Sequence, residues 1–229
     1  MKDVSEIFEE IVNAIDNTIS IDSLSVVAGK LRVYTCDTKW LRVGKKVSGK
    51  ILGGSIKEAY VTAIDVDKYF EIDNVNILSD ILIPKPTSMF GTRTATNNEW
   101  NLKTPNLMDK TPIIWCLELV NETHYGAEAS LERDIEMRVF FLDETDVLNY
   151  TTKDHRTQVV KPMTYLAHAF KKVIDKNTLF KSIAQFNVLG FSRFGTENVT
   201  GMIENILDAN LSGTSVQFTV SKYKESCKC

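Results

Sequence analysis

The opening segment of the chain has apolar side chains at helical spacing. Between residues 5 and 19 they recur three or four positions apart, as Ile7, Phe8, Ile11, Val12, Ile15 and Ile19. This spacing places the apolar residues on one side of an α-helix, while the acidic residues between them face solvent. Acidic residues in the first turns also suit the positive end of the helix dipole. The pattern predicts an amphipathic opening helix.

The pattern changes to that of β-strands between Leu24 and about Pro84. Apolar and β-branched residues fill three stretches, separated by glycine turns, at residues 25–37, 39–54 and 58–73. Short runs of this type bounded by turns predict a small β module. The module could be a compact antiparallel meander or a partial barrel, and a β-rich extension of the main sheet would show the same pattern.

Residues 87–101, which follow two prolines, are expected to form a long polar loop. They are rich in Thr and Asn, which favour turns over regular structure. Loops of this length inside a compact domain are usually functional or disordered, and aromatic and arginine side chains often anchor interfaces. We therefore expect either a partner-binding loop or a loop that folds back over its own domain. The candidate contacts between subunits in this segment are Phe90, Arg93, Asn97, Asn98 and Trp100.

The second half of the chain carries the clearest pattern. Residues 111–120 are almost wholly apolar, as in a strand covered on both faces, and residues 135–143 alternate as in a strand. The further predicted elements are strands at 183–195 and 214–223, an amphipathic helix at 161–175, and a short helical turn at 198–213 closed by Gly213. Because the order is helix, strands, helix, strands, an antiparallel α+β sandwich fits better than a doubly wound parallel sheet.

The composition indicates a soluble protein with its own core. The chain has 229 residues, 43% of them hydrophobic, and a net charge of -3 that gives no general attraction to nucleic acid or anionic membranes. Its first residues lack the basic start of a signal peptide, and no apolar run reaches the roughly 20 residues that span a membrane. The four cysteines, among them Cys227 and Cys229, are expected to be reduced thiols rather than disulfides or a zinc site.

No motif for a cofactor or for nucleophilic catalysis is found in the sequence. The glycines at 49–54 do not form a phosphate-binding loop before a helix, and there is no nucleophile elbow. The histidines His124, His155 and His168 are too dispersed for a catalytic triad or a zinc helix. We therefore expect no cofactor and no enzymatic activity.

Asp143, Glu144 and Asp146 form the best group of carboxylates, directly after a predicted strand. A strand end can aim several carboxylates at one cation or one proton, so metal binding or acid–base catalysis is one interpretation. The group lacks the glycine and the spacing of a calcium loop, and a solvated turn or a charged contact between subunits is favoured instead. The basic side chains that could pair with these carboxylates on a neighbouring copy are Lys153, His155 and Arg156.

The second half resembles structural proteins at the head-to-tail junction of tailed bacteriophages. The stretches that carry the resemblance are, in order, PIIWCLELV, SLERDIEMRVFFLDETD, VVKPMTYLAHAF and NLSGTSVQFTV. The similar proteins are the tail-completion, tail-terminator and neck proteins, and the resemblance covers about residues 1–20 and 105–229. It implies an α+β fold in which two helices flank an antiparallel sheet of about four or five strands. In this chain a small β module is expected to be inserted in that fold or appended to it.

The resemblance also implies a structural role in the virion. Such proteins close into rings of about six or twelve copies, contact other tail, neck or portal proteins, and let DNA pass without binding it specifically. By this resemblance the protein is made in the host cytoplasm, takes its place in the tail or neck and binds no membrane. The expected division is a core of residues 1–22 and 102–229 and a β-rich insertion of residues 23–101, which the compact relatives do not carry at that length.

Two other functions stay open as alternatives. The β module could act as an adaptor that binds a partner protein or a glycan, and independent folding of that segment would support this function. A metal-dependent hydrolase that uses the carboxylates after residue 142 is less favoured, and tight binding of a divalent cation would be its evidence.

Overall fold

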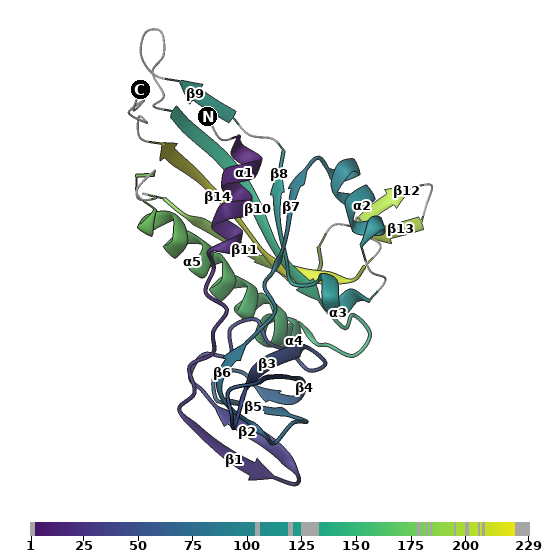
Figure 1. The fold of residues 1–229 in the computed structure, drawn as a ribbon. Coiled ribbons are helices and arrows are strands. Elements are labelled where there is room, and N and C mark those ends of the chain that lie inside the picture. The colour runs from purple at the N-terminus through teal and green to yellow at the C-terminus, as the bar shows by residue number, and fades with distance from the viewer. Residues whose placement is uncertain are drawn as a thin grey trace, which may run out of the picture.

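Two large β-sheets, one in the lower and one in the upper part of the molecule, form the framework of the protein (Figure 1). The computed structural model describes residues 3–103, 106–118, 121–124, 133–177, 180–181, 183, 185–194, 196–199, 202–205, 207 and 209–222. The lower sheet, built from residues 23–82, is named the β module, and the upper sheet, built from residues 87–222, is named the main sheet. Helices pack on the main sheet, so the protein has an α+β fold.

The opening helix α1 (Val4–Asn13) confirms the helical pattern of the N-terminal segment. Its buried side chains are Val4, Ile7, Phe8, Ile11 and Val12. The helix ends before Ile15 and Ile19, although both side chains are buried. The chain leaves the helix because it pairs with the end of the β module, where the Ile19 N–H donates to the Ile81 carbonyl at 2.8 Å.

The β module is an antiparallel sheet of six strands. Its strands are β1 (Ser23–Val27), β2 (Lys30–Tyr34), β3 (Lys46–Ile51), β4 (Ile56–Asp65), β5 (Tyr69–Ile72) and β6 (Ile77–Leu82), in the order β1-β2-β5-β4-β3-β6. The long strand β4 pairs with β3 through its first half and with β5 through its second half, so it joins the two parts of the module. Val33, Phe70 and Ile72 are fully buried inside it. The module is therefore a sheet of its own and not an extension of the main sheet.

The main sheet combines strands from both halves of the chain. Its strands are β7 (Thr87–Gly91), β8 (Ile113–Leu117), β9 (Asn121–His124), β10 (Arg133–Glu144), β11 (Asn187–Phe191) and β14 (Leu211–Lys222). The order is β11-β14-β10-β8-β7, and β9 also pairs with β10. All of these pairs are antiparallel except β7–β8, which is parallel. The predicted α+β class is confirmed, but the protein has more strands than predicted and its main sheet is not purely antiparallel.

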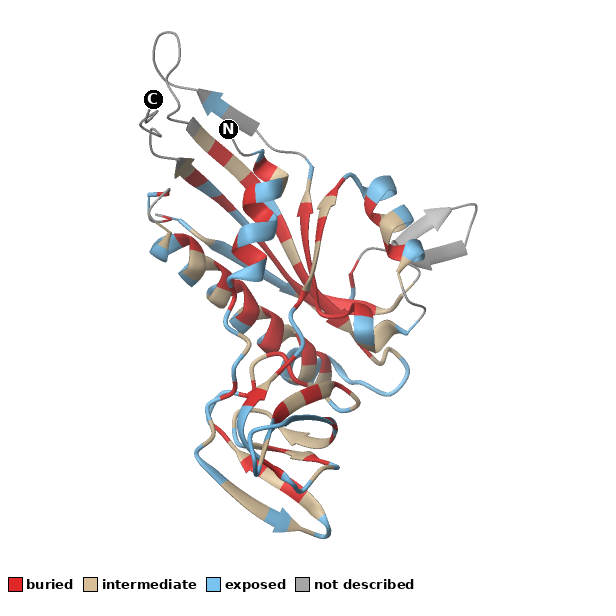
Figure 2. Cartoon of the chain, in the orientation of Figure 1, coloured by how far each residue is buried: buried red, intermediate tan, exposed pale blue. Residues whose placement is uncertain are grey.

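Helices α1 and α5 (Lys161–Lys176) cover one face of the main sheet (Figures 1 and 2). The buried side chains that β10 and β14 turn toward them are Ile135, Met137, Val139, Phe141, Val216, Phe218 and Val220. On α5 the Phe170 ring lies 5.5 Å from that of Phe141 and 6.1 Å from that of Phe218. The helical turns α4 (Thr152–His155) and η1 (Arg156–Val160) lead into α5. The alternating strands and the amphipathic helix predicted here are confirmed.

A second apolar cluster lies on the opposite face of the main sheet. Its members are Met89, Trp100, Ile113, Trp115, Leu142, Phe194, Leu207 and Leu211. Two short helices, α2 (Arg93–Leu102) and α3 (Leu107–Lys110), stand beside it. Trp115 stacks on Phe140 with ring centroids 5.3 Å apart. The main sheet is thus covered on both faces over part of its length, which explains the nearly continuous apolar run of β8.

The prediction of a long polar loop at residues 87–101 is wrong. Residues 87–91 form β7, in which Met89 and Gly91 are buried, and Thr92 caps α2 by accepting a hydrogen bond from the Ala95 N–H at 3.3 Å. β7 pairs with β8, so this segment belongs to the main sheet and not to the inserted module. The polar residues that suggested a loop lie on the exposed side of a short helix.

The predicted helical turn at residues 198–213 is also wrong. The described part of this segment contains a hairpin of β12 (Thr196–Val199) and β13 (Met202–Asn205), followed by the start of β14. Gly213 lies inside β14, opposite Leu142 of β10, and does not end a helix. A Cβ at this glycine would collide with the Phe141 carbonyl, so glycine is needed here for the close approach of two strands.

Candidate functional site

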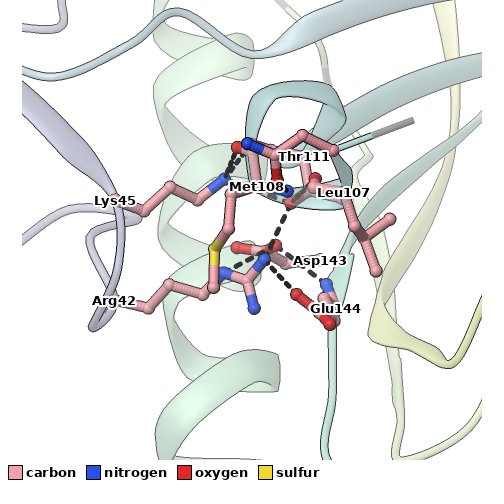
Figure 3. A network of polar contacts seen from close by, with 8 residues as sticks. Arg42, Lys45, Leu107, Met108, Thr111, Asp143 and Glu144 are labelled. Atoms are coloured by element: carbon pink, nitrogen blue, oxygen red, sulfur yellow. Dashed lines mark hydrogen bonds and ion pairs between the residues drawn. The ribbon is translucent and has the colours of Figure 1, made fainter. Parts of the chain in front are cut away.

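Polar side chains from three distant segments meet where the β module joins the main sheet (Figure 3). Arg42 and Lys45 lie in the turn before β3, Thr111 lies between α3 and β8, and Asp143 and Glu144 end β10. Lys45 and Thr111 are 66 positions apart in the sequence. We call these five residues the junction network, because they fasten the β module to the main sheet.

Strand β4 fixes the turn that carries the two basic residues. The Gly44 N–H donates to the Val61 carbonyl at 2.8 Å, and the Val61 N–H donates to the Lys45 carbonyl at 2.9 Å. Gly44 has a φ of 87°, a conformation that favours glycine, and a Cβ there would lie 3.0 Å from the Met108 side chain. The glycine therefore lets the turn come close to α3, where the acceptors for Lys45 lie.

Lys45 is a buried cation with all of its donors in use. Its residue surface is only 2% exposed. The Nζ donates to the Met108 carbonyl at 2.9 Å, to the Thr111 Oγ1 at 3.1 Å and to the Thr111 carbonyl. Burial lowers the pKa of this amine to about 8, an effect that the nearby carboxylate of Asp143 opposes. Three donors facing three acceptors leave no N–H for a substrate, so Lys45 holds the junction together.

Arg42 binds both carboxylates at the end of β10. Its Nη2 lies 2.7 Å from the Glu144 Oε2 and also donates to the Thr111 Oγ1 at 3.0 Å. Its Nε lies 3.2 Å from the Asp143 Oδ1, a charged contact whose geometry does not align a hydrogen bond. Asp143 is only 3% exposed, so its ion-pair partner comes from within the chain.

The three carboxylates that lie close together in the sequence are separated in the structure. Asp143 and Glu144 belong to the junction network, and burial removes Asp143 from any surface that a neighbouring copy could reach. Asp146 is half-buried and organises a turn, accepting hydrogen bonds from the Leu148 and Asn149 N–H groups at 3.0 Å. Its hydrogen bonds with Asn149 lower the pKa of this carboxyl. The expected inter-subunit role of Asp143 is therefore corrected to one inside the chain.

Of the three basic residues near this turn, one is buried and two are exposed. His155 is buried, and its Nδ1 lies 2.6 Å from the Thr145 Oγ1. Lys153 and Arg156 are exposed on α4 and η1. Arg156 thus remains accessible for contacts with other chains, whereas His155 supports the packing of the segment after β10.

The candidate inter-subunit contacts of residues 87–101 also include both buried and exposed side chains. Trp100 is 3% exposed and packs in the second cluster, with the Lys110 Nζ 4.4 Å from its ring centre and hydrogen-bonded to its carbonyl at 2.9 Å. It cannot anchor a partner, which corrects the expectation for this residue. Arg93 and Asn98 are exposed, and Asn97 and Phe90 are half-buried.

A groove opens beside the junction network. Its volume is about 410 Å³, and its wall includes Arg42, Val43, Glu144, Leu148 and Tyr150. Apolar side chains form one part of this wall, and the Arg42–Glu144 ion pair closes another. Among the described residues, no group of three or more His, Cys, Asp or Glu side chains could hold a metal ion.

Local sequence signals did not reveal the junction network. Lys45 stands in a run of alternating residues next to another lysine, which is typical of a solvated strand end. The acceptors that allow its burial lie on a segment more than 60 positions away. The glycine before it was the one local sign of a close approach.

These features define an α+β protein in which a six-stranded β module is fastened by a buried polar network to a helix-covered main sheet. No protein-family model, no curated protein and no solved structure matches the chain. In the described part of the chain, no helix has the length and apolar character that a membrane crossing requires.

Proposed function

We propose that this protein is a structural protein that joins copies of itself into a ring at the head-to-tail junction or the tail end of a tailed bacteriophage. The resemblance of its second half to tail-completion, tail-terminator and neck proteins motivates the particular location. The open margin of the main sheet supports self-assembly, independently of that resemblance.

The observation that carries the proposal is the exposed edge strand β11. It ends the main sheet and pairs with β14, for example through Val188 and Val216, but with no other described strand. Val188 is 39% exposed and Leu189 is 62% exposed. An edge strand with exposed apolar side chains is a template for pairing with another chain, and soluble proteins usually protect such an edge. In the proposed ring a neighbouring copy covers it.

The opposite margin of the same sheet is built differently. It ends in β7, on which α1 and α2 pack, so Met89 and Gly91 are buried and the rest of the strand is half-buried. Two unlike margins suit a head-to-tail contact, in which one surface meets a different surface on the next copy. Such contacts generate closed rings when the rotation between copies closes, and a ring of about six or twelve copies is part of the proposal.

The β module forms a second layer in each copy, separate from the main sheet. It lies below the main sheet in Figure 1 and is fastened there by the junction network. In a ring formed through the margins of the main sheet, the modules would stand together on one side. We assign them to contacts with adjacent tail, neck or portal proteins, while DNA passes through the ring without specific binding.

The experiment that tests the proposal places a charge on the open edge. Leu189→Lys should weaken self-association by about tenfold or more, because lysine on an edge strand disfavours pairing with another strand. Sedimentation velocity over a range of concentrations measures the shift from ring to smaller species. Leu148→Lys is the matched control, since Leu148 is also highly exposed but lies in the turn after β10. A wild-type protein that stays monomeric at every concentration would refute the proposal.

A further inference from the structure

The outer side of α5 and the β7 margin of the main sheet carry opposite charges. Helix α5 packs on β10 and β14, on the side that ends in β11, whereas α1 packs on β7 at the other margin. α1 also touches α5, so it separates the outer side of α5 from the β7 margin (Figure 1). A head-to-tail arrangement can therefore place these two surfaces against different neighbours.

On its outer side, α5 presents a basic stripe. The exposed stripe contains His168, Lys172 and Lys176, at helical spacing. Of these three residues, His168 lies closest to β11, because its ring is 6.0 Å from that of Phe186, the residue directly before β11. Other lysines of this helix have acidic partners, such as Lys171 with Asp175. Within the described residues, Lys172 and Lys176 have no such ion pair. They border a pocket that Asp16 and Asp37 also line, and Asp16 is paired there with Lys39 at 3.0 Å.

On the β7 side, an acidic groove lies between α1, β7 and α2. Its volume is about 270 Å³, and its lining includes Glu6, Glu9, Ser88, Phe90 and Glu99 but no basic residue. Of the three carboxylates, Glu99 has a cation partner, Lys103 at 3.1 Å. Glu6 accepts a backbone hydrogen bond from Asp3, and Glu9 has no ion pair in the described part of the chain. The groove thus combines unbalanced negative charge with the half-buried ring of Phe90.

We propose that the acidic groove of one copy receives the α5 basic stripe of the next copy, with Lys172 and Lys176 facing Glu6 and Glu9. This inference rests on the proposed ring function and specifies which surfaces meet. Opposite charges attract across the head-to-tail contact, whereas two basic stripes or two acidic grooves repel each other. The charges therefore direct the open sheet margins toward ring closure and away from symmetric dimers.

Paired charge reversals test the inference. Lys172→Glu/Lys176→Glu makes both surfaces acidic, and Glu6→Lys/Glu9→Lys makes both surfaces basic. Each variant alone should associate at least about tenfold more weakly than wild type in sedimentation velocity. An equimolar mixture should recover assemblies, because each acidic surface then meets a basic one. An alternating ring needs an even number of copies, as rings of about six or twelve provide.

A single chain that carries all four reversals should also assemble, because its two surfaces are again complementary. The matched control is Lys57→Glu/Lys68→Glu, which changes the net charge equally on exposed positions of β4 and of the turn after it. Glu6→Gln/Glu9→Gln removes the charge while keeping an oxygen for the helix start, and should give a smaller loss. Far-UV circular dichroism verifies that each variant is folded.

The outcomes separate this inference from the proposed function. If wild-type protein forms rings and the reversed variants form them equally well, the ring proposal stands and the charge pairing is refuted. If the mixture fails to assemble while each variant alone is impaired, the two surfaces do not meet each other. If wild-type protein never associates, the ring proposal fails and the charge pairing with it.

Discussion

Lys45 is a buried cation whose protonation is linked to folding. Its pKa falls from the usual 10.5 to about 8, because burial disfavours the charged amine more than Asp143 favours it. Between these two values the unfolded chain holds more protons on this group than the folded chain does. The contribution of Lys45 to the free energy of unfolding therefore rises as the pH rises from about 8 to about 10.5. Below about pH 8 the amine is protonated in both states, and the contribution is constant.

Lys45→Met should remove this pH dependence. The difference in unfolding free energy between wild type and variant should shift by roughly 3 kcal/mol in favour of wild type between pH 8 and pH 10.5. Urea titrations at half-unit pH steps measure this difference. Other groups that titrate in this range are present in both proteins, so their effects cancel when the two are compared. Methionine also leaves the carbonyl acceptors without a donor, a cost that does not vary with pH. Parallel pH curves for the two proteins would contradict the account of Lys45.

At the scale of elements, regular apolar patterns predicted structure well and mixed patterns did not. The alternation of β10 and β14 and the apolar stripe of α5 confirmed the predicted strands and helix. Helix α2 gave no such signal, because of its ten residues only Thr96 and Trp100 are buried. Strand β7 is short and pairs in parallel with a strand more than twenty positions later. Residues 87–91 therefore form a strand because they pair with β8, and their own composition does not indicate it.

Gly213→Ala tests the close approach of β10 and β14. The added Cβ would collide with the Phe141 backbone carbonyl, which a side-chain rotation cannot relieve, so we expect a loss of about 3 kcal/mol in unfolding free energy. Chemical denaturation followed by tryptophan fluorescence measures it. Thr219→Ala, at an exposed position of the same strand, should change stability by less than about 0.5 kcal/mol. An equally small effect at Gly213 would mean that β10 and β14 can move apart enough to fit the added Cβ without a loss of unfolding free energy.

For the whole molecule, the sequence predicted the β module and the helix-covered sheet better than the contacts that join them. It indicated a β module and a helix-covered sheet, but the residues that join them, Arg42 and Lys45, lie far in sequence from their partners Thr111 and Asp143. The inter-subunit candidates were chosen by residue type, and burial removed Asp143 and Trp100 from that set. Surface position decides which side chains can meet another copy, and that position follows only from the assembled fold.

The proposed ring depends on two unlike margins of one sheet, β11 with the basic stripe of α5 and β7 with the acidic groove beside α1. Cryo-electron microscopy of the purified wild-type protein tests this arrangement most directly. We predict closed rings in which the β11 margin of every copy faces the β7 margin of the next. Solitary particles at all concentrations, or two-fold dimers in which identical margins face each other, would contradict it.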